Sequence, residues 1–454
     1  MIPLMNLSVA ILCLAAATCC WAEDNTLSDT GFFTHENPDI QIAVTSENPE
    51  VGRLVNLGLK ECLYGSNERA ANYFDDALQE DSACLLAHIG MMMIHPVRSE
   101  IYRHHLQQLN TGLDEAFLTP VEEWYVSTFI QYLNGDLPGA AKAFKERAAI
   151  YRRDAMAACW DVVLNIYAGE PAETLLARAD KLAERLPQSP LAHYCRALAE
   201  QHTKASEKAL QAIETASRLS SKSPHPAIEL LAGRLKSRAG QLTEARKHFE
   251  CAASHAPEKS EAYYAAQLSI PDVWVKSGDK KNWVEALKFA RQLSEKAPSS
   301  PGETDGETLC FWEAKTLLLR MLVLQKTPPG GPAINMAARS CNAPADSALK
   351  LVQDCLVAAI QARSLAETGR QTTATTTFTK AEQLLARLQR EEEYQLQKGG
   401  MNLVCWQRAF RACSGALYRA KLALYKNSTD IWQPYLDKIL DTPEPRFLPP
   451  VLPH

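Results

Sequence analysis

The chain has 454 residues, which is long for one compact core, so two or more domains or one elongated array is expected. Apolar residues make up 46% and charged residues 22% of the sequence, which is typical of globular rather than disordered proteins. The formal net charge is only -5, and Lys and Arg are dispersed without a basic block, so charge gives no support for nucleic-acid binding.

The first 22 residues have the pattern of a secretory signal peptide. An apolar run, Leu7 to Trp21, is followed by a small-residue site ending at Ala22 and then by acidic, polar sequence. The run is short for a transmembrane helix, which needs about 20 apolar residues. We therefore predict export, without a transmembrane helix in the mature chain. As an alternative, Cys19 or Cys20 carries an N-terminal lipid anchor.

Residues 23–47 are polar without a sustained period and are expected to form a leader that packs loosely or is flexible. Helical repeats begin near Asn48 and are predicted to continue through residue 298. In the first copy, Gly58 lies on the first helix, and small, large and small residues follow four and three positions apart on the second helix. These three residues are Ala70, Phe74 and Ala77.

The next units follow the pattern less closely. One begins near Trp124, but Arg147 stands where its second helix should carry a small Ala. A degenerate pair beginning at residue 161 comes next, directly after Trp160, and another covers residues 191–219. A later unit spans residues 260–298 and carries Tyr263 and Tyr264 at the start of its first helix.

The clearest copy spans residues 227–257. Gly233 allows a neighbouring helix to approach closely, Gly240 marks the turn, and Pro257 ends the second helix. The small, large and small residues of that helix are Ala245, Phe249 and Ala252. Small residues at the close contact with one aromatic between them are what a tight antiparallel helix pair requires.

After residue 298 the pattern is interrupted and then returns. Residues 299–307 are predicted to be a linker, and residues 308–441 a C-terminal helical region with repeat-like units. The repeat spacing recurs there at Ala374, Phe378 and Ala381. Residues 442–454 contain five prolines, so they are expected to form a tail over the surface.

These spacings resemble the tetratricopeptide repeat, a helix–turn–helix unit of about 34 residues. The segment with Asp81, Cys84, Ala87 and Gly90 also resembles a variant seen in large bacterial proteins of this family. The resemblance implies an all-α fold, a tetratricopeptide-type α-solenoid of stacked antiparallel helix pairs with a concave groove. In such a solenoid the first helix of each pair faces the groove. The aromatic residues predicted to meet a partner there, or alternatively to pack between pairs, are Trp124, Trp160, Tyr263 and Tyr264.

Clusters that could carry chemistry are better explained by packing. His88, His95, His104 and His105 lie near three methionines, but their spacing matches no known metal motif. His248 and His255 flank Cys251, without a signature for a nucleophilic cysteine. The other cysteines lie in helical patterns, which favours buried thiols over a disulfide framework. We expect no catalytic residue, no metal site and no cofactor, and therefore not an enzyme.

The sequence supports two functional hypotheses. The first is an exported scaffold in the periplasm or cell envelope of a bacterium, which binds a peptide segment or a partner protein in the concave groove. The alternative is a glycan-binding protein at the outer membrane that resembles SusD and stacks sugars on aromatic rings. A resemblance in fold cannot separate them, because function depends on the site.

Overall fold

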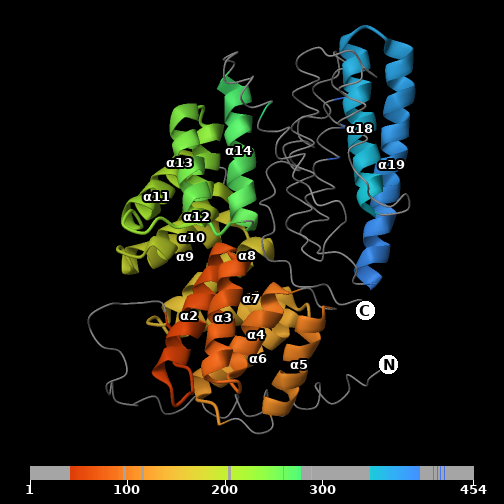
Figure 1. Ribbon diagram of the computed structural model, residues 1–454. Coiled ribbons are helices and arrows are strands. Elements are labelled where there is room, and N and C mark those ends of the chain that lie inside the picture. The colour runs from red at the N-terminus through yellow and green to blue at the C-terminus, as the bar shows by residue number, and fades with distance from the viewer. Residues whose placement is uncertain are drawn as a thin grey trace.

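The computed structural model describes residues 41–95, 99–113, 117–202, 206–258, 260–277 and 348–398, together with positions 288, 413, 417, 420 and 424. Within these residues, α-helices are the only regular secondary structure. Figure 1 shows them as short rods of similar length that stack beside one another in chain order from α2 to α14.

Successive helices pack as pairs, and this makes the protein an all-α solenoid of the tetratricopeptide type. Six pairs run from α2 to α13, α14 follows them, and α18 and α19 form a further hairpin. The pairs are α2 (Pro49–Tyr64) with α3 (Asn67–Glu80), α4 (Leu85–Ile94) with α5 (Glu100–Leu113), α6 (Pro120–Leu133) with α7 (Leu137–Ile150), α8 (Ala155–Tyr167) with α9 (Ala172–Arg185), α10 (Pro190–His202) with α11 (Ser206–Leu219), and α12 (Pro226–Arg238) with α13 (Leu242–His255). The remaining helices are α14 (Glu261–Ser277), α18 (Ala348–Glu367) and α19 (Gln371–Lys398).

Local sequence sets the helix ends. Gly65 and Gly240 close the turns of their units with φ of 74° and 76°, a left-handed conformation that glycine adopts without steric cost. Asn48 caps α2 by accepting a hydrogen bond from the Glu50 backbone N–H, and Asp136 caps α7 in the same way through Gly139. These residues turn the chain sharply enough for each second helix to fold back on the first.

The repeat residues of the first unit lie in the core. Ala70, Phe74 and Ala77 are fully buried. The Phe74 ring enters between α2 and α4, where a Cβ added at Gly58 would lie 2.5 Å from it, and Gly90 faces the same ring from α4. A side chain at either glycine would collide with the ring, so the two glycines and Phe74 fix the spacing of these helices.

Two later copies are packed in the same way. Phe249 is 2% exposed and lies against Gly233, where an added Cβ would be 2.6 Å from the ring. Ala245 and Ala252 beside it are fully buried. In the C-terminal hairpin the equivalent positions are also buried; they are Ala374, Phe378 and Ala381.

Residues 41–47 of the predicted leader pack against the first unit. Ile42 is 5% exposed, and its backbone N–H donates to Asn56 Oδ1 at 2.6 Å, while Asn56 Nδ2 donates back to the Ile42 carbonyl at 2.8 Å. The Thr45 backbone N–H donates to the Glu122 carboxylate of α6 at 2.8 Å. An extended segment held by side-chain amides and carboxylates has no helical period, so the sequence pattern did not reveal it.

The expected open groove along the first helices is wrong at α4 and α8. All residues of α8 from Ala155 to Ile166 are buried, as are all those of α4 except Ile94. The array curls tightly enough for early units to meet late ones: the ring centroids of Tyr64 in α2 and Tyr194 in α10 are 5.0 Å apart. These contacts hold early and late units together.

Several predictions fall outside the described residues. They concern the signal peptide of residues 1–22, the lipid anchor at Cys19 or Cys20, the linker of residues 299–307, the tail of residues 442–454, and most of residues 308–347 and 399–441. Among the described helices, none is both long and apolar enough to cross a membrane.

Candidate functional site

The prediction that Trp160 faces a partner is wrong. Its side chain is fully buried, and its ring lies 5.2 Å from that of Phe129 and 5.9 Å from that of Phe144, measured between centroids. The sequence placed Trp160 on a first helix, but α8 is enclosed by other helices. The ring therefore belongs to the core.

The other predicted aromatic residues have different surroundings. Tyr263 is half-buried at the start of α14, and the side chain of Tyr264 lies outside the described residues. Trp124 is also half-buried, packed edge-on against Phe144 with centroids 5.2 Å apart. Trp124 lies in a cluster with further polar and aromatic contacts.

Arg147 is the centre of that cluster. Its guanidinium carbon lies 4.4 Å from the centroid of Trp124, 5.2 Å from that of Tyr125 and 4.9 Å from that of Tyr151. A guanidinium at these distances is attracted to the electron-rich faces of the rings. Arg147 replaces the small residue of the repeat, and the larger side chain joins the start of α6 to the end of α7.

Asp154 holds the cluster in place. Its carboxylate accepts hydrogen bonds from Arg147 Nε at 2.6 Å, from the Tyr125 hydroxyl at 2.5 Å and from the Ala157 backbone N–H at 2.9 Å, which caps α8. Burial and the neighbouring carboxylate of Asp154 raise the pKa of Tyr125 well above its usual range. The hydroxyl therefore remains a donor, and the guanidinium and the rings are rigidly placed.

Exposed apolar side chains border this cluster. Phe117 is 93% exposed, Val121 38%, Ile150 72% and Tyr151 47%. Phe117 and Val121 lead into Trp124 on α6, whereas Ile150 and Tyr151 follow Arg147 on α7. We name this patch the α6–α7 surface; it consists of Phe117, Val121, Trp124, Ile150 and Tyr151, and Arg147, which is 9% exposed, lies beneath it. The sequence signal that could have located it is Arg147 at a position that otherwise takes Ala.

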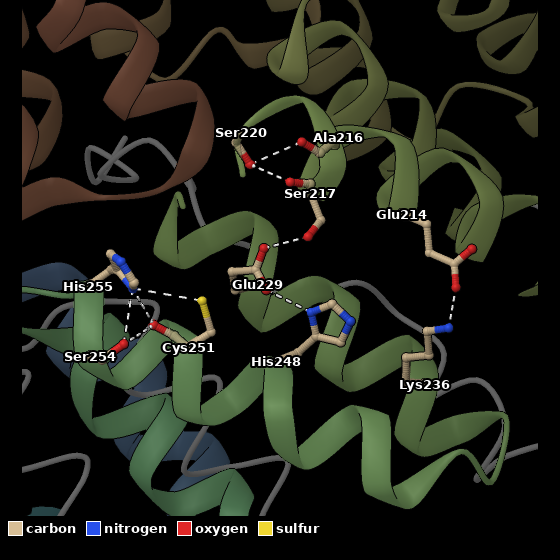
Figure 2. Close-up of polar contacts among 10 residues, drawn as sticks. All are labelled: Glu214, Ala216, Ser217, Ser220, Glu229, Lys236, His248, Cys251, Ser254 and His255. Atoms are coloured by element: carbon tan, nitrogen blue, oxygen red, sulfur yellow. Dashed lines mark hydrogen bonds and ion pairs between the residues drawn. The ribbon is translucent and has the colours of Figure 1, made fainter. Parts of the chain in front are cut away.

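A second polar cluster joins the units around α12. Figure 2 shows the Glu229 carboxylate between Ser217 and His248, with the Ser217 hydroxyl donating at 2.6 Å and His248 Nδ1 lying 2.7 Å away. Burial acts to raise the pKa of Glu229, but the hydrogen bonds from His248 and Ser217 outweigh it and leave the pKa below its usual value. Glu229 occupies the place of the aromatic that is usual early in this helix of the repeat. It bridges α11, α12 and α13.

The cysteine beside this cluster has no feature of an activated nucleophile. Cys251 Sγ lies 3.7 Å from His255 Nδ1, and His255 Nδ1 is also 2.9 Å from the Cys251 carbonyl oxygen (Figure 2). Burial and the charge of Glu229 raise the pKa of Cys251, which disfavours the thiolate that nucleophilic catalysis requires. The other described cysteines are buried and form no disulfide; they are Cys62, Cys84, Cys159, Cys195, Cys355 and Cys413.

Two of the clustered histidines form a buried hydrogen-bonded pair. His88 Nε2 lies 3.0 Å from the Ser82 carbonyl oxygen, which only accepts, so this nitrogen carries the hydrogen. Neutral His88 then has a lone pair on Nδ1, which accepts from His105 Nδ1 at 2.8 Å. Burial, reinforced by His88 and His104, lowers the pKa of His105 to about 4. Within the described residues, no group of three or more His, Cys, Asp or Glu side chains is arranged to hold a metal ion.

Comparison with known proteins gives a similarity of shape only. No family model matches the chain, and no curated protein matches it in sequence. Among solved structures, yeast Tom70 is 14% identical with a TM-score of 0.37, over 65% of this chain and 69% of that chain. A monomeric mutant of IFIT1 with Gppp-AAAA is 13% identical with a TM-score of 0.37, over 88% and 95%. Naa15/Naa10 bound to HypK-THB is 12% identical with a TM-score of 0.29, over 86% and 64%.

Proposed function

We propose that the protein is a helical-repeat scaffold that binds a partner protein through the α6–α7 surface. The observation that supports this proposal is the ordered cluster of Trp124, Arg147 and Tyr151 beside exposed Ile150 and Val121. Trp and Tyr, the two accessible residues of this cluster, are among the residues that most often dominate the binding energy of protein interfaces. Because Asp154 already fixes Arg147, little side-chain freedom would be lost on binding.

The binding surface proposed here replaces the concave groove. The first helices α4 and α8 offer few exposed side chains, whereas the end of the α6–α7 pair offers large apolar ones. The glycan-binding alternative depended on exposed rings of the first helices, and burial of Trp160 removes one of its two leading candidates. A surface of protruding side chains is better suited to a protein than to a sugar.

Export and the absence of catalysis belong to the same proposal. Residues 1–22 have the pattern of a signal peptide, which supports a place in the periplasm or cell envelope of a bacterium. The absence of catalytic sequence motifs and the raised pKa of Cys251 support binding without chemistry or a cofactor. The scaffold would then act by holding its partner.

Affinity capture from native cells tests the proposed surface. The tagged full chain, an Ile150→Asp/Tyr151→Asp variant and a Thr243→Asp control on exposed α13 are compared for the proteins they retain. We expect a partner to be recovered with the parent and the control but lost with the double variant, while all three keep the same melting temperature. Equal recovery with the double variant, or no partner recovered with the parent, would contradict the proposal.

A further inference from the structure

We propose that Cys159 and Cys195 are joined by a disulfide bond in the mature protein, and that this bond fastens α8 to α10 where the array closes. The inference goes beyond the proposed binding surface, but it rests on the proposed export, because disulfides persist in the oxidising compartments outside the cytosol. Both residues carry thiols in the structure, and the proposal concerns their oxidation as the exported chain folds.

The two cysteines meet from neighbouring first helices. α8 and α10 begin successive pairs and pack directly on one another. Cys159 and Cys195 are both fully buried, and their thiols are hydrogen-bonded to each other. A disulfide requires Cβ atoms about 4 Å apart. Side chains whose thiol groups already meet need only a small adjustment to reach that separation.

Small residues on α10 accompany this close contact. Ala192 lies three positions before Cys195 and Ala199 four positions after it, so both share its face of the helix, and both are fully buried. A helix face of small residues allows a neighbouring helix to approach closely.

The pair lies where early and late units meet. Burial raises the pKa of Tyr64 in α2 well above its usual range, and the thiols of Cys195 and Cys159 lie near enough to add to the shift. The Tyr64 ring also meets that of Tyr194, the residue before Cys195, with centroids 5.0 Å apart. A bond between the two cysteines would stabilise this junction, and the chain loop that it closes through α9 would restrict the unfolded state.

Thiol–disulfide exchange supplies the oxidation. The thiolate of one cysteine attacks a disulfide of the oxidant, an oxidised dithiol oxidoreductase of the cell envelope, which forms a mixed disulfide and releases one thiolate of the oxidant. The second cysteine attacks the protein's sulfur in that mixed disulfide, which forms the Cys159–Cys195 bond and releases the other thiolate. Two protein thiols are thus oxidised, the disulfide of the oxidant is reduced, and the two protons pass to the released thiolates.

Burial determines when this exchange takes place. Burial and the hydrogen bond with Cys195 raise the pKa of the Cys159 thiol well above its usual range. The thiolate that exchange requires is therefore rare once α8 and α10 have packed. The bond forms before packing is complete, and the folded protein then shields it from reductants.

A second pair of thiols has the same arrangement. Cys355 of α18 and Cys413 are both fully buried and hydrogen-bonded to each other. A cysteine that serves only as a small apolar group has no reason to lie beside another cysteine. Recurrence of such pairs favours a covalent role over the isolated buried thiols that the sequence pattern indicated.

Mass spectrometry of the full chain taken from native cells tests the bond. Thiols are blocked with iodoacetamide in denaturant before any reduction, and the protein is then digested. We expect the peptides that carry Cys159 and Cys195 to be recovered as one linked species that reduction separates. Cys62, an equally buried thiol on α2, should be alkylated without reduction.

Thermal unfolding tests whether the bond fastens the two helices. Reductant should lower the melting temperature of the parent by several degrees more than that of Cys159→Ala/Cys195→Ala. The matched control is Cys62→Ala/Cys84→Ala, which removes two other buried thiols and should respond to reductant as the parent does.

Alkylation of both Cys159 and Cys195 before reduction would overturn the proposal and would leave the α6–α7 surface, which partner capture tests, unaffected. A bond that appears only when the reduced chain is refolded with oxidised glutathione would contradict its presence in the mature protein, and export with it. An equal effect of reductant on the parent and on Cys159→Ala/Cys195→Ala would show that the bond does not fasten α8 to α10.

Discussion

At the scale of single residues, an aromatic ring packed against a glycine characterises the first unit and the α12–α13 unit. Removing the Phe249 ring should lower the free energy of unfolding by about 3–5 kcal/mol, because Phe249 is 2% exposed and leaves a cavity. Gly233→Ala should cost about 1–3 kcal/mol, because its Cβ would lie 2.6 Å from the ring.

The double variant separates these two effects. Once the ring is absent, Gly233→Ala should be neutral or should stabilise by up to about 1 kcal/mol, because Ala favours a helix over Gly. Chemical denaturation of the parent, both single variants and the double variant measures the four free energies of unfolding. Costs that simply add would show that the ring and the glycine are not in contact.

Residue spacing predicted these packing positions, but it could not predict the contacts of the polar residues that replace expected repeat residues. The packing positions can be recognised in the sequence because an α-helix repeats every 3.6 residues in any surroundings, and this places Ala70, Phe74 and Ala77 on one face. The roles of Arg147 and Glu229 instead depend on residues outside their own helices. Arg147 contacts Asp154 and Trp124. Glu229 contacts Ser217 and His248. The sequence identified these two positions because they depart from the repeat pattern, but only the tertiary structure shows what their side chains contact.

At the scale of helices, α5 is held against α4 in part by a buried histidine, His105, which should become charged in acid. It packs mainly against α4, through the His105–His88 hydrogen bond and buried Tyr102 and Leu109. The folded pKa of His105, about 4, lies below its ordinary value of 6.5. A base with a lowered folded pKa contributes stability above its unfolded pKa and loses it as the pH falls toward the folded value.

The free energy of unfolding should therefore fall by on the order of 3 kcal/mol through His105 between pH 6.5 and pH 4. His105→Asn should remove most of this dependence, whereas His104→Asn, at an exposed position beside it, should retain it. Urea denaturation across this pH range measures the slope. If the His105→Asn variant showed the same slope as the parent, the buried pair would not be the acid-sensitive element.

At the scale of the whole molecule, contacts between distant units close the array. Glu61 of α2 accepts from His225 Nε2 at 3.0 Å and pairs with Arg69 Nη2 at 3.1 Å. The His225 ring also stacks on Tyr64 with centroids 3.9 Å apart. His225 and Glu61 are 164 residues apart in the chain, so this clasp joins the first unit to the sixth.

Glu61→Gln should lower the free energy of unfolding by about 1–3 kcal/mol, because it weakens two hydrogen bonds of a buried carboxylate. Hydrogen exchange should become faster at both the end of α2 and the start of α12, since the two ends are held by one clasp. Glu50→Gln, which alters an exposed pair with Arg53, should change neither. Faster exchange in α2 alone would mean that the clasp does not couple the two units.

This closure explains why the sequence could predict the solenoid but not which of its first helices are exposed. The helix pairs are local structures, and their order follows from the repeat. Whether a first helix faces solvent depends on contacts such as Tyr64 with Tyr194, which no local pattern encodes. Trp160 was therefore expected at a groove and lies instead in the core.

Site-specific photo-crosslinking in native cells tests the central claim most directly. A photoreactive phenylalanine analogue replaces Ile150 on the α6–α7 surface or, as the matched control, Glu244 at an exposed position of α13. The account predicts a discrete protein adduct from position 150 and none from position 244. Adducts of equal yield from both positions, or from position 244 alone, would contradict it.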